Sequence, residues 1–392
     1  MFGRSLVVAA AIAAAVLVPA AQAAHRSTVK LPLVPLQKSQ LGVASRSLPL
    51  EHDSGPVSNA TAANNASGKV TVTQLEKLGR VTGYQLDYGN PFLPGKGVRE
   101  IETGVERYRS AAGAKKGLAF WKKDELQVAS LAQFGVKVAL KGIHAPRIAA
   151  AHWAYVATLT IPNTTPIYGV DEDVRDGNYL VSVSVAAGSL RAAEHLAPKL
   201  AKKVDARLRA MLDRKLRGRP AKLPARLEAG PPSSGPDPAK AAFATSDFTQ
   251  ATLSSEHYVR NQEALSEYLV ALRPAGSFAG VFQEIVAEST SSEATYYGAL
   301  LASSLANLAA GGSGLSNLQM TPVDLSGVGD SAYGALLQFT LSGQTIYEGA
   351  LVLVNGPLVE LVFGAAKTAI AASDVTSLAQ VAAAKLNAAV SG

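Results

Sequence analysis

The densest chemical feature of the sequence is a basic segment at residues 199–226. It holds eleven lysines and arginines against two aspartates, a net charge of +9. Clustered cations attract anionic lipid, anionic cell-wall polymer or an acidic part of the same chain. We therefore expect an anion-binding surface made by eight residues of the segment: Lys199, Lys202, Lys203, Arg207, Arg209, Arg214, Lys215 and Arg217.

The same segment also has the pattern of an ordinary amphipathic helix. A leucine or valine recurs at every fourth residue from Leu196 to Leu216. Because burying a leucine side chain contributes about 1.5–3 kcal/mol, this ridge belongs on a sheet. The basic faces then remain at the surface, where simple solvation is the alternative to binding an anion.

Two smaller groups of residues could line a binding pocket. His152 and Trp153 stand at the start of an expected strand, where a histidine beside an aromatic ring can form a polar pocket. Tyr296, Tyr297 and Tyr347 could line an apolar pocket in the C-terminal half. The alternative for all five is packing in a core, which is the commoner fate of such residues.

The motifs of catalysis and cofactor binding are incomplete. Residues 329–333, Gly-Asp-Ser-Ala-Tyr, lack the last glycine of a nucleophile elbow and lead into an expected strand. Residues 327–332 imitate a dinucleotide-binding loop without its helix, and residues 89–96 are one residue too long for a P-loop. The six histidines lack the spacing of a zinc helix. We expect no enzyme, no cofactor and no metal.

Three consecutive acids occur within one expected strand. Asp171, Glu172 and Asp173 must alternate between the two faces of that strand. This pattern predicts a solvated strand edge, where charge discourages edge-to-edge pairing.

The N-terminus predicts export. Arg4 precedes an apolar run that ends at Pro19, and residues 21–23 offer small side chains for cleavage before Ala24. The run is shorter than the roughly 20 residues that span a bilayer, so a retained anchor is the lesser alternative. We expect an extracellular or envelope-associated protein, for which nucleic acid is not an expected partner. The chain has no cysteine, which excludes disulfides.

A repeated pattern predicts two domains of one architecture. Ile167 precedes Asp176-Gly177, and Ile346 precedes Asn355-Gly356, at the same offset of 10 residues to the glycine. Such dipeptides favour type I′ hairpin turns. The expected order is a signal peptide (1–23), an irregular arm (24–69), a basic repeat (70–222), a linker rich in Pro, Gly and Ser (223–241) and an acidic repeat (242–392).

The two halves differ in charge as well as in sequence. Residues 24–230 carry a net +14 and residues 231–392 a net −8. This asymmetry predicts either a basic face for an anionic partner or two domains that attract each other.

Each repeat is expected to be α+β, a mainly antiparallel sheet with helices packed on it. Helices are expected at residues 97–123, 190–216, 261–272, 292–309 and 374–390, with a shorter one at 73–78. Strands are expected at 81–88, 135–140, 153–161, 167–174 and 179–187, and then at 278–287, 319–325, 332–341, 345–354 and 358–363.

The order of elements, with the phrase Val328-Gly329-Asp330-Ser331-Ala332 leading into a strand, resembles a family of envelope proteins. It is similar to the LpqN and PsbP-like α/β sandwiches and to the external sensor domain of actinobacterial receptor kinases. The resemblance covers residues 278–390 best and the first repeat from Trp153 onward. It implies a non-enzymatic role in binding a ligand or a protein outside the cell, and it implies no catalytic residue.

We therefore expect a non-catalytic binding or sensing protein of the bacterial cell envelope, with an apolar small molecule or an envelope protein as partner. One alternative is an adaptor that holds anionic lipid or cell-wall polymer through the basic segment. The other is an envelope hydrolase, which would require a compact serine, histidine and acid arrangement or a carboxylate cluster.

Overall fold

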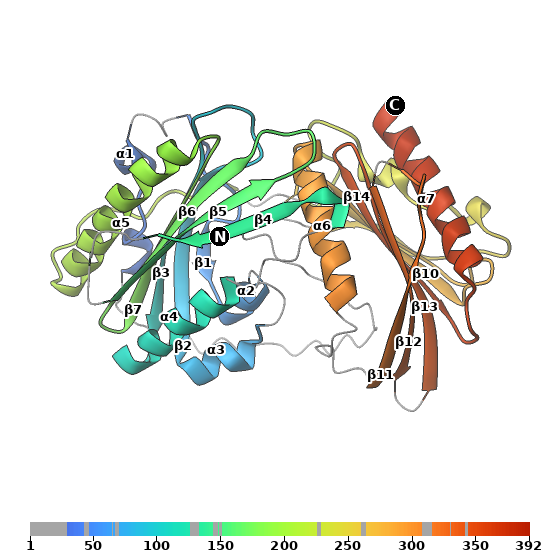
Figure 1. The fold of residues 1–392 in the computed structure, drawn as a ribbon, viewed down its shortest axis with the longest axis horizontal. Coiled ribbons are helices and arrows are strands. Elements are labelled where there is room, and N and C mark those ends of the chain that lie inside the picture. The colour runs from blue at the N-terminus through green and yellow to red at the C-terminus, as the bar shows by residue number, and fades with distance from the viewer. Residues whose placement is uncertain are drawn as a thin grey trace. The chain divides into compact units, whose positions relative to one another are not determined.

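The chain forms two compact units (Figure 1). The computed structural model describes residues 30–42, 47–64, 66, 70–125, 133–143, 148, 151–225, 229–259, 264–307, 316–329, 331–341 and 344–392. The expected export signal lies outside these residues. The first unit runs to residue 126 and adds residues 140–157 and 168–224. The second takes residues 127–139, 158–167 and 225 onwards.

In the described part of the chain, the first sheet has seven strands in the order β1-β2-β3-β7-β6-β5-β4. The pairs β1–β2, β2–β3, β3–β7 and β7–β6 are all antiparallel. The strands are β1 (Gly55–Val57), β2 (Arg80–Gly89), β3 (Val98–Tyr108), β4 (Lys137–Gly142), β5 (Ala151–Thr160), β6 (Ile167–Asp176) and β7 (Tyr179–Ala187). The helices of this stretch are η1 (Leu31–Leu33), α1 (Lys38–Leu41), α2 (Asn59–Asn64), α3 (Val72–Leu78), α4 (Ala111–Glu125), η3 (Gln133–Gly135) and α5 (Leu190–Leu212).

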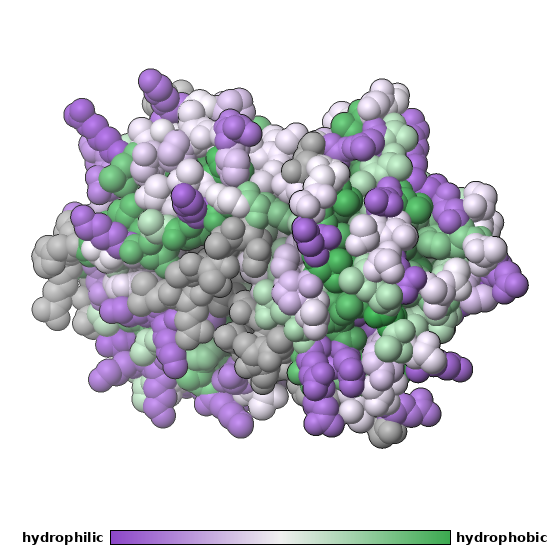
Figure 2. Space-filling view, turned by 45° about the vertical axis from the view of Figure 1, so that its right-hand side comes forward, coloured by the Kyte–Doolittle hydropathy of each residue, from purple (hydrophilic) through white to green (hydrophobic). Residues whose placement is uncertain are grey.

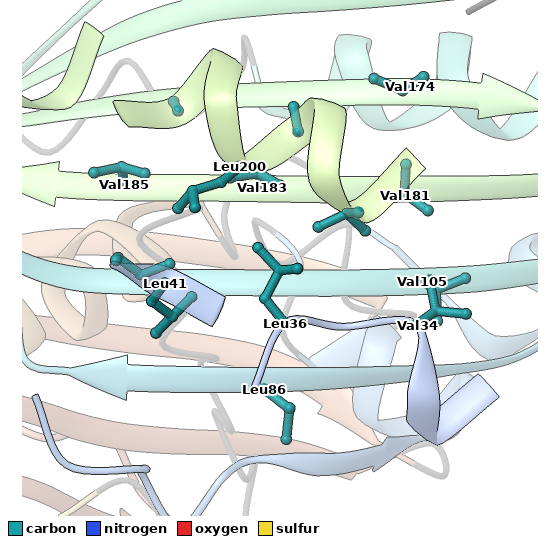
Figure 3. Close-up of a cluster of buried hydrophobic side chains, with 14 of the residues drawn as sticks. Val34, Leu36, Leu41, Leu86, Val105, Val174, Val181, Val183, Val185 and Leu200 are labelled. Atoms are coloured by element: carbon teal, nitrogen blue, oxygen red, sulfur yellow. The ribbon is translucent and has the colours of Figure 1, made fainter. Parts of the chain in front are cut away.

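One face of the first sheet is mainly apolar and is covered by α5 and the segment from η1 to α1. Leu200 and Val204 of α5 are fully buried against Val183 and its neighbours on the central strands. Val34, Leu36 and Leu41 join the same cluster from the N-terminal segment, as Figure 3 shows. The segment expected to be an irregular arm therefore supplies part of the core, because its apolar residues cover strands that α5 alone does not reach.

The opposite face of the first sheet is covered by α2, α3 and α4 at one end. Leu75 of α3 and Trp121 of α4 pack there against Tyr108 and Leu180. Thr71 caps α3, since its hydroxyl accepts from the backbone of Gln74, whose side chain accepts from the backbone N–H of Thr71. This second face becomes polar beyond Tyr108 and Leu180, and that polar part forms the candidate site.

The second sheet also has seven strands among the residues that the structure describes, in the order β11-β12-β13-β14-β10-β9-β8. All of its pairs are antiparallel. The strands are β8 (Leu253–Val259), β9 (Ser266–Leu272), β10 (Gly280–Ala287), β11 (Ser316–Val323), β12 (Ser331–Leu341), β13 (Gln344–Asn355) and β14 (Leu358–Ala366). The helices are η4 (Pro238–Ala241), η5 (Thr245–Asp247), α6 (Ser291–Asn307) and α7 (Ala372–Ser391).

Helices cover both faces of the second sheet. On one face Leu378 and Leu386 of α7 pack with Leu351 and Leu353 of β13. On the other, α6 approaches so closely that a Cβ on Gly298 would lie 2.3 Å from a methyl of Val354. Both units are thus α+β, with helices packed around an antiparallel sheet, and the predicted fold class is confirmed.

Both predicted hairpins form, but the expected type I′ turn is wrong, because neither Asp176 nor Asn355 adopts the positive φ that this turn requires. Gly177 and Gly356 both adopt positive φ, 56° and 53°. The turns set the registers Asp176↔Tyr179 and Asn355↔Leu358. In each unit the hairpin leads into the long closing helix, α5 or α7.

Two predicted helices are wrong. Residues 98–108 form strand β3 and only residues 111–125 form a helix, because the alternation of Ile101, Thr103 and Val105 follows the period of a strand. Residues 266–272 form strand β9, whose residues are buried at every second position. Strand β8 was not predicted at all.

Candidate functional site

The basic segment binds parts of its own unit. The Arg207 guanidinium donates to the carbonyl oxygens of Val34, at 3.0 Å from Nε, and of Leu33. Lys203 Nζ donates to the carbonyl oxygen of Gln40 at 2.9 Å. These two side chains therefore hold the N-terminal segment on the sheet.

Other members of the basic segment also have partners in the same unit. Arg209 pairs with Asp205 at 2.9 Å and with Asp176 at 3.4 Å. Lys215 pairs with Asp213 at 3.2 Å, and Arg217 donates to the carbonyl oxygen of Arg214. Lys199 contacts His195. On the face that Figure 2 shows, hydrophilic side chains are interspersed with apolar ones. Anion binding by the eight residues remains a prediction.

His152 and Trp153 point to opposite faces of the first sheet. His152 lies on the side of α5, where its Nε2 is 3.1 Å from Oε2 of the buried Glu172. Trp153 lies on the other side, stacked on Tyr155 with 4.6 Å between ring centroids. The Lys122 ammonium is 5.6 Å from the centre of the Trp153 ring, a cation–π distance. The two residues do not share one pocket.

The three tyrosines of the second unit are also apart. Tyr296 and Tyr297 are buried on α6. Tyr347 lies on β13 at a position that shares its face with Leu351 and Leu353, which pack against α7. Because α6 and α7 cover different faces of the sheet, these three residues do not line a common cavity.

A set of carboxylates on the second face of the first sheet was not predicted from the sequence. In β2, β3 and β6, apolar residues facing α5 alternate with acids facing the other way, for example Leu86 with Asp87 and Ile101 with Glu102. We call this set the acidic face and define it by four residues: Asp87, Glu102, Asp171 and Asp173.

Strand register aligns the acidic face into two rows. In the first row Asp87 is opposite Glu102, Glu102 is opposite Ser184, and Ser184 is opposite Asp171. In the second row Ser182 is opposite Asp173. Residues directly opposite each other on an antiparallel pair have their Cβ atoms about 4.5–5.5 Å apart, and like charges there are destabilising.

Asp87 is the most constrained member. Asp87 is only 8 % exposed to solvent. Its Oδ1 is buried and has no hydrogen-bond partner among the described residues. Burial raises the pKa of Asp87 well above its usual range, and the carboxylates of Glu100, Asp53 and Glu102 raise it further. The backbone of Asp87 is firmly held, since its N–H donates to the Ser54 hydroxyl at 2.9 Å.

The neighbouring acids are shifted in the same direction. Burial raises the pKa of Glu102 to about 7, with further contributions from Asp53 and Asp171. Burial raises the pKa of Asp173 to about 8, helped by Asp171, Glu106 and Glu102. Near neutral pH the acidic face therefore carries both protons and negative charge, and any added cation would favour the charged forms.

A nearby half-buried carboxylate, Glu106, is neutralised within the same unit. Glu106 lies on the same face of β3 and is paired with the fully buried Arg80 at 2.7 Å. Its other oxygen accepts from Tyr108 at 2.7 Å and from Trp121 at 3.0 Å. Arg80 and Glu106 form a structural ion pair. Among the described residues, Asp87 has no basic side chain in the equivalent position.

The expectation of a solvated strand edge at residues 171–173 is wrong. Strand β6 lies between β7 and β5, so it is an interior strand. Asp171 is buried on the acidic face and Glu172 is buried on the opposite face beside His152. The signal that could have found the site is the period-two alternation of acids with valines in β6, taken together with the same alternation in β2 and β3.

Neither a metal site nor a membrane span is found in the part of the chain that the structure describes. No group of three or more His, Asp or Glu side chains there has the geometry to hold a metal ion. No helix among those residues has the length and apolar character that crossing a bilayer requires.

Comparison with known proteins gives weak likenesses. No family model and no curated protein matches the chain. The extracellular domain of PknH from Mycobacterium tuberculosis is similar with 12% identity and a TM-score of 0.29, over 45% of this chain and 95% of that one. The apo immunity protein TplEi of the T6SS from Pseudomonas aeruginosa is similar with 14% identity and a TM-score of 0.18, over 78% of this chain and 95% of that one. Both TM-scores are below 0.5, so neither the fold nor the function of this chain follows from these likenesses.

Proposed function

We propose that the chain is a non-catalytic binding protein exported to the bacterial cell envelope, whose first unit takes up a cationic ligand on the acidic face. Export is supported by the features of residues 1–23: a positive start, an apolar run and a small-residue cleavage site. Cation binding is supported by the acidic face, and one observation carries it: the placement of Asp87.

Asp87 is a buried carboxylate without a counter-charge in the described part of the chain. Burying a charged group is costly unless it is paired and hydrogen-bonded. On the same face Arg80 neutralises the carboxylate of Glu106. The fold can therefore place an arginine beside a carboxylate on this face. At Asp87 the Oδ1 atom is left without a partner among the described residues, directly opposite a second acid, Glu102. A bound cation would supply the counter-charge that Asp87 does not find among the described residues.

The pKa shifts favour binding over hydrolysis. A carboxylate-based glycosidase needs one acid that stays protonated and one that stays ionised. Such pairs are recognised by environments that push their pKa values apart. In the acidic face the pKa values of Asp87, Glu102 and Asp173 are all raised. Because all three pKa values are shifted in the same direction, the cluster fits a cation-binding site better than a pair of acid and base catalysts.

The contacts of α5 argue against the adaptor alternative. Arg207 and Lys203 donate hydrogen bonds to the N-terminal segment. Arg209 forms ion pairs with Asp205 and Asp176. Exposed ion pairs and solvated lysines of this kind contribute little on their own. Anionic vesicles would nevertheless bind the protein in a salt-dependent way if the adaptor alternative were right.

The test is calorimetric titration of the mature protein with small ammonium compounds, with magnesium chloride as a metal control. We expect binding of at least one ammonium compound to the wild type and at least tenfold weaker binding to Asp87→Asn. The matched control is Asp213→Asn, which removes an exposed carboxylate at the end of α5 and should bind as the wild type does.

Three outcomes would contradict the proposal. The first is the absence of binding by every ammonium compound. The second is equal binding by Asp87→Asn and the wild type. The third is turnover of a cell-wall glycan that is lost in Glu102→Gln, which would establish the hydrolase instead.

A further inference from the structure

We infer that the ligand of the acidic face is a linear polyamine, lying across β3, β7 and β6 with one ammonium group at Asp87 and Glu102 and another at Asp171 and Asp173. This inference rests on the proposed function and specifies its ligand. It follows from how the charges are distributed along the two rows.

The acids form two groups with an uncharged strand between them. Asp87 and Glu102 are direct cross-strand neighbours on β2 and β3. Asp171 and Asp173 are two residues apart on β6 and so point to the same side. Strand β7 lies between β3 and β6, and it presents Ser182 and Ser184 to this face at the same rows. The site is thus two anionic ends joined by a hydroxyl-lined floor.

The spacing of the two ends suits a molecule with separated charges. Glu102 and Asp171 are two strand positions apart, which corresponds to roughly 10 Å because neighbouring strands lie 4.7–4.9 Å apart. A single ammonium group cannot contact both ends at this distance. An extended chain advances about 1.2 Å per bond, so a molecule with about eight bonds between its terminal nitrogens reaches from one end to the other.

The floor between the ends suits an aliphatic chain that carries polar nitrogens. Gly104, in the second row, has no side chain, and a Cβ there would lie 2.6 Å from Ser182 Oγ. The Ser182 hydroxyl therefore occupies the space over Gly104 and lines the floor at this point. The serine hydroxyls can accept hydrogen bonds from a secondary ammonium group in the middle of the chain.

The degree of burial also fits a ligand that enters from solvent. Asp87 and Asp171 are buried, whereas Glu102, Ser182 and Asp173 are partly exposed. On the neighbouring strand β5, Trp153 and Tyr155 present stacked rings to the same face. The Trp153 ring already holds the Lys122 ammonium at a cation–π distance, which shows that this border accepts a cation.

A metal ion fits the arrangement less well. No three acids or histidines among the described residues converge in a metal-binding geometry. Divalent cations need several oxygen ligands within about 2–2.6 Å of one point. Carboxylates spread over two rows and three strands, β2, β3 and β6, instead match separated positive charges.

The inference is tested by calorimetry with a series of terminal diamines of increasing length, together with spermidine, diaminobutane and butylamine. The titrations are made at about pH 8.5, where amines of the lysine type are still protonated. We expect spermidine and diaminoheptane to bind at least tenfold more tightly than diaminobutane, which is too short to reach both ends. Butylamine should bind more weakly still.

Two variants separate the two ends of the site. Glu102→Gln and Asp173→Asn should each weaken spermidine binding at least tenfold, and each should abolish the preference for the longer diamines. Asp213→Asn should leave both unchanged. Both substitutions imitate the protonated acid, so the fold should tolerate them, and circular dichroism of each variant checks this.

The outcomes distinguish this inference from the proposed function. If butylamine, diaminobutane and spermidine bind equally, and only Glu102→Gln weakens them, cation binding stands and the two-ended polyamine site is wrong. Tighter binding of a trilysine peptide than of spermidine would also overturn the inference, in favour of a basic peptide. If no amine binds at all, the proposed function itself fails.

Discussion

Asp87 and Glu102 are direct cross-strand neighbours on β2 and β3, and both carboxyl groups point to the polar face of the first sheet. Few arrangements in an antiparallel sheet are less favourable, because like charges directly opposite each other repel. Burial makes the repulsion harder to screen, since salt screens exposed charges far better than buried ones. The proposed cation binding would account for the pair, because the two carboxylates would then form one half of a site for positive charge.

Asp87→Asn should stabilise the protein at about pH 8. The substitution removes a carboxyl group whose ionisation is opposed by burial and by Glu100, Asp53 and Glu102. The size of the effect should be about 1–3 kcal/mol, the range of an unsatisfied buried polar group. Thermal unfolding followed by circular dichroism measures it. A lower midpoint for Asp87→Asn than for the wild type would show that the carboxylate is an internal stabilising group and not part of a cation site.

Stability should fall as the pH rises from about 4.5 to about 8. The pKa of Glu102 is raised to about 7 and that of Asp173 to about 8 in the folded state. Over this interval the folded protein holds protons that the unfolded chain has released, so the free energy of unfolding decreases with pH. The groups that face these acids on the same side are Asp53, Asp87, Glu100, Glu106, Asp171, Arg175 and the Lys122 ammonium of α4.

Urea unfolding at about pH 5 and pH 8 checks this prediction. The double variant Glu102→Gln with Asp173→Asn should flatten the dependence. A free energy of unfolding that rises over the same interval would mean that these carboxylates are ionised and paired in the folded protein. Saturating spermidine should also flatten the dependence, because it stabilises the ionised forms.

Glu360 provides a comparable test in the second unit. It is fully buried on β14, accepts from Gln283 Nε2 at 2.6 Å, and its Oε2 has no partner among the described residues. Burial raises its pKa to about 8. Glu360→Gln should therefore stabilise the second unit above about pH 6 by about 1–3 kcal/mol, and it should leave amine binding unchanged. Destabilisation at pH 8 would indicate that Lys385 neutralises Glu360.

Arg207→Gln should release the N-terminal segment from the first sheet. The guanidinium donates to the carbonyl oxygens of Leu33 and Val34, which lie over the apolar face. Losing hydrogen bonds from a charged donor costs about 1.5–3 kcal/mol. Hydrogen exchange of residues 31–41 should accelerate at least tenfold, whereas Lys202→Gln should change nothing. Unchanged exchange in Arg207→Gln, with loss of binding to anionic vesicles, would instead support the adaptor.

Much of the fold could be predicted from local patterns, because those patterns are complete within one element. The Asp176-Gly177 and Asn355-Gly356 turns need positive φ, and the leucine ridge of α5 needs a sheet to pack on. β3 could not be predicted from spacing alone, since Val98, Ile101, Val105 and Tyr108 also recur at the helical interval. Its strand period is visible only through Ile101, Thr103 and Val105.

The acidic face could not be predicted because it depends on the order of strands in space. Glu102 lies in a segment whose spacing predicts a helix, and Asp171 and Asp173 lie in a strand whose charges predict an edge. Only the placement of β3 beside β2, and of β7 between β3 and β6, brings the four acids onto one face. The N-terminal segment was missed for a similar reason: Leu36 has no periodic neighbours, and its burial depends on contacts with distant strands.

Calorimetric titration of spermidine into the mature protein at about pH 6 and about pH 8.5 tests cation binding at the acidic face most directly. Because the cation favours ionised carboxylates whose pKa values are raised, binding should be several-fold tighter at the higher pH and should release protons near pH 7. Asp87→Asn should lose most of this affinity, and Asp213→Asn should keep it. Absence of binding by the wild type, or equal affinity for the wild type and Asp87→Asn, would contradict cation binding at this face.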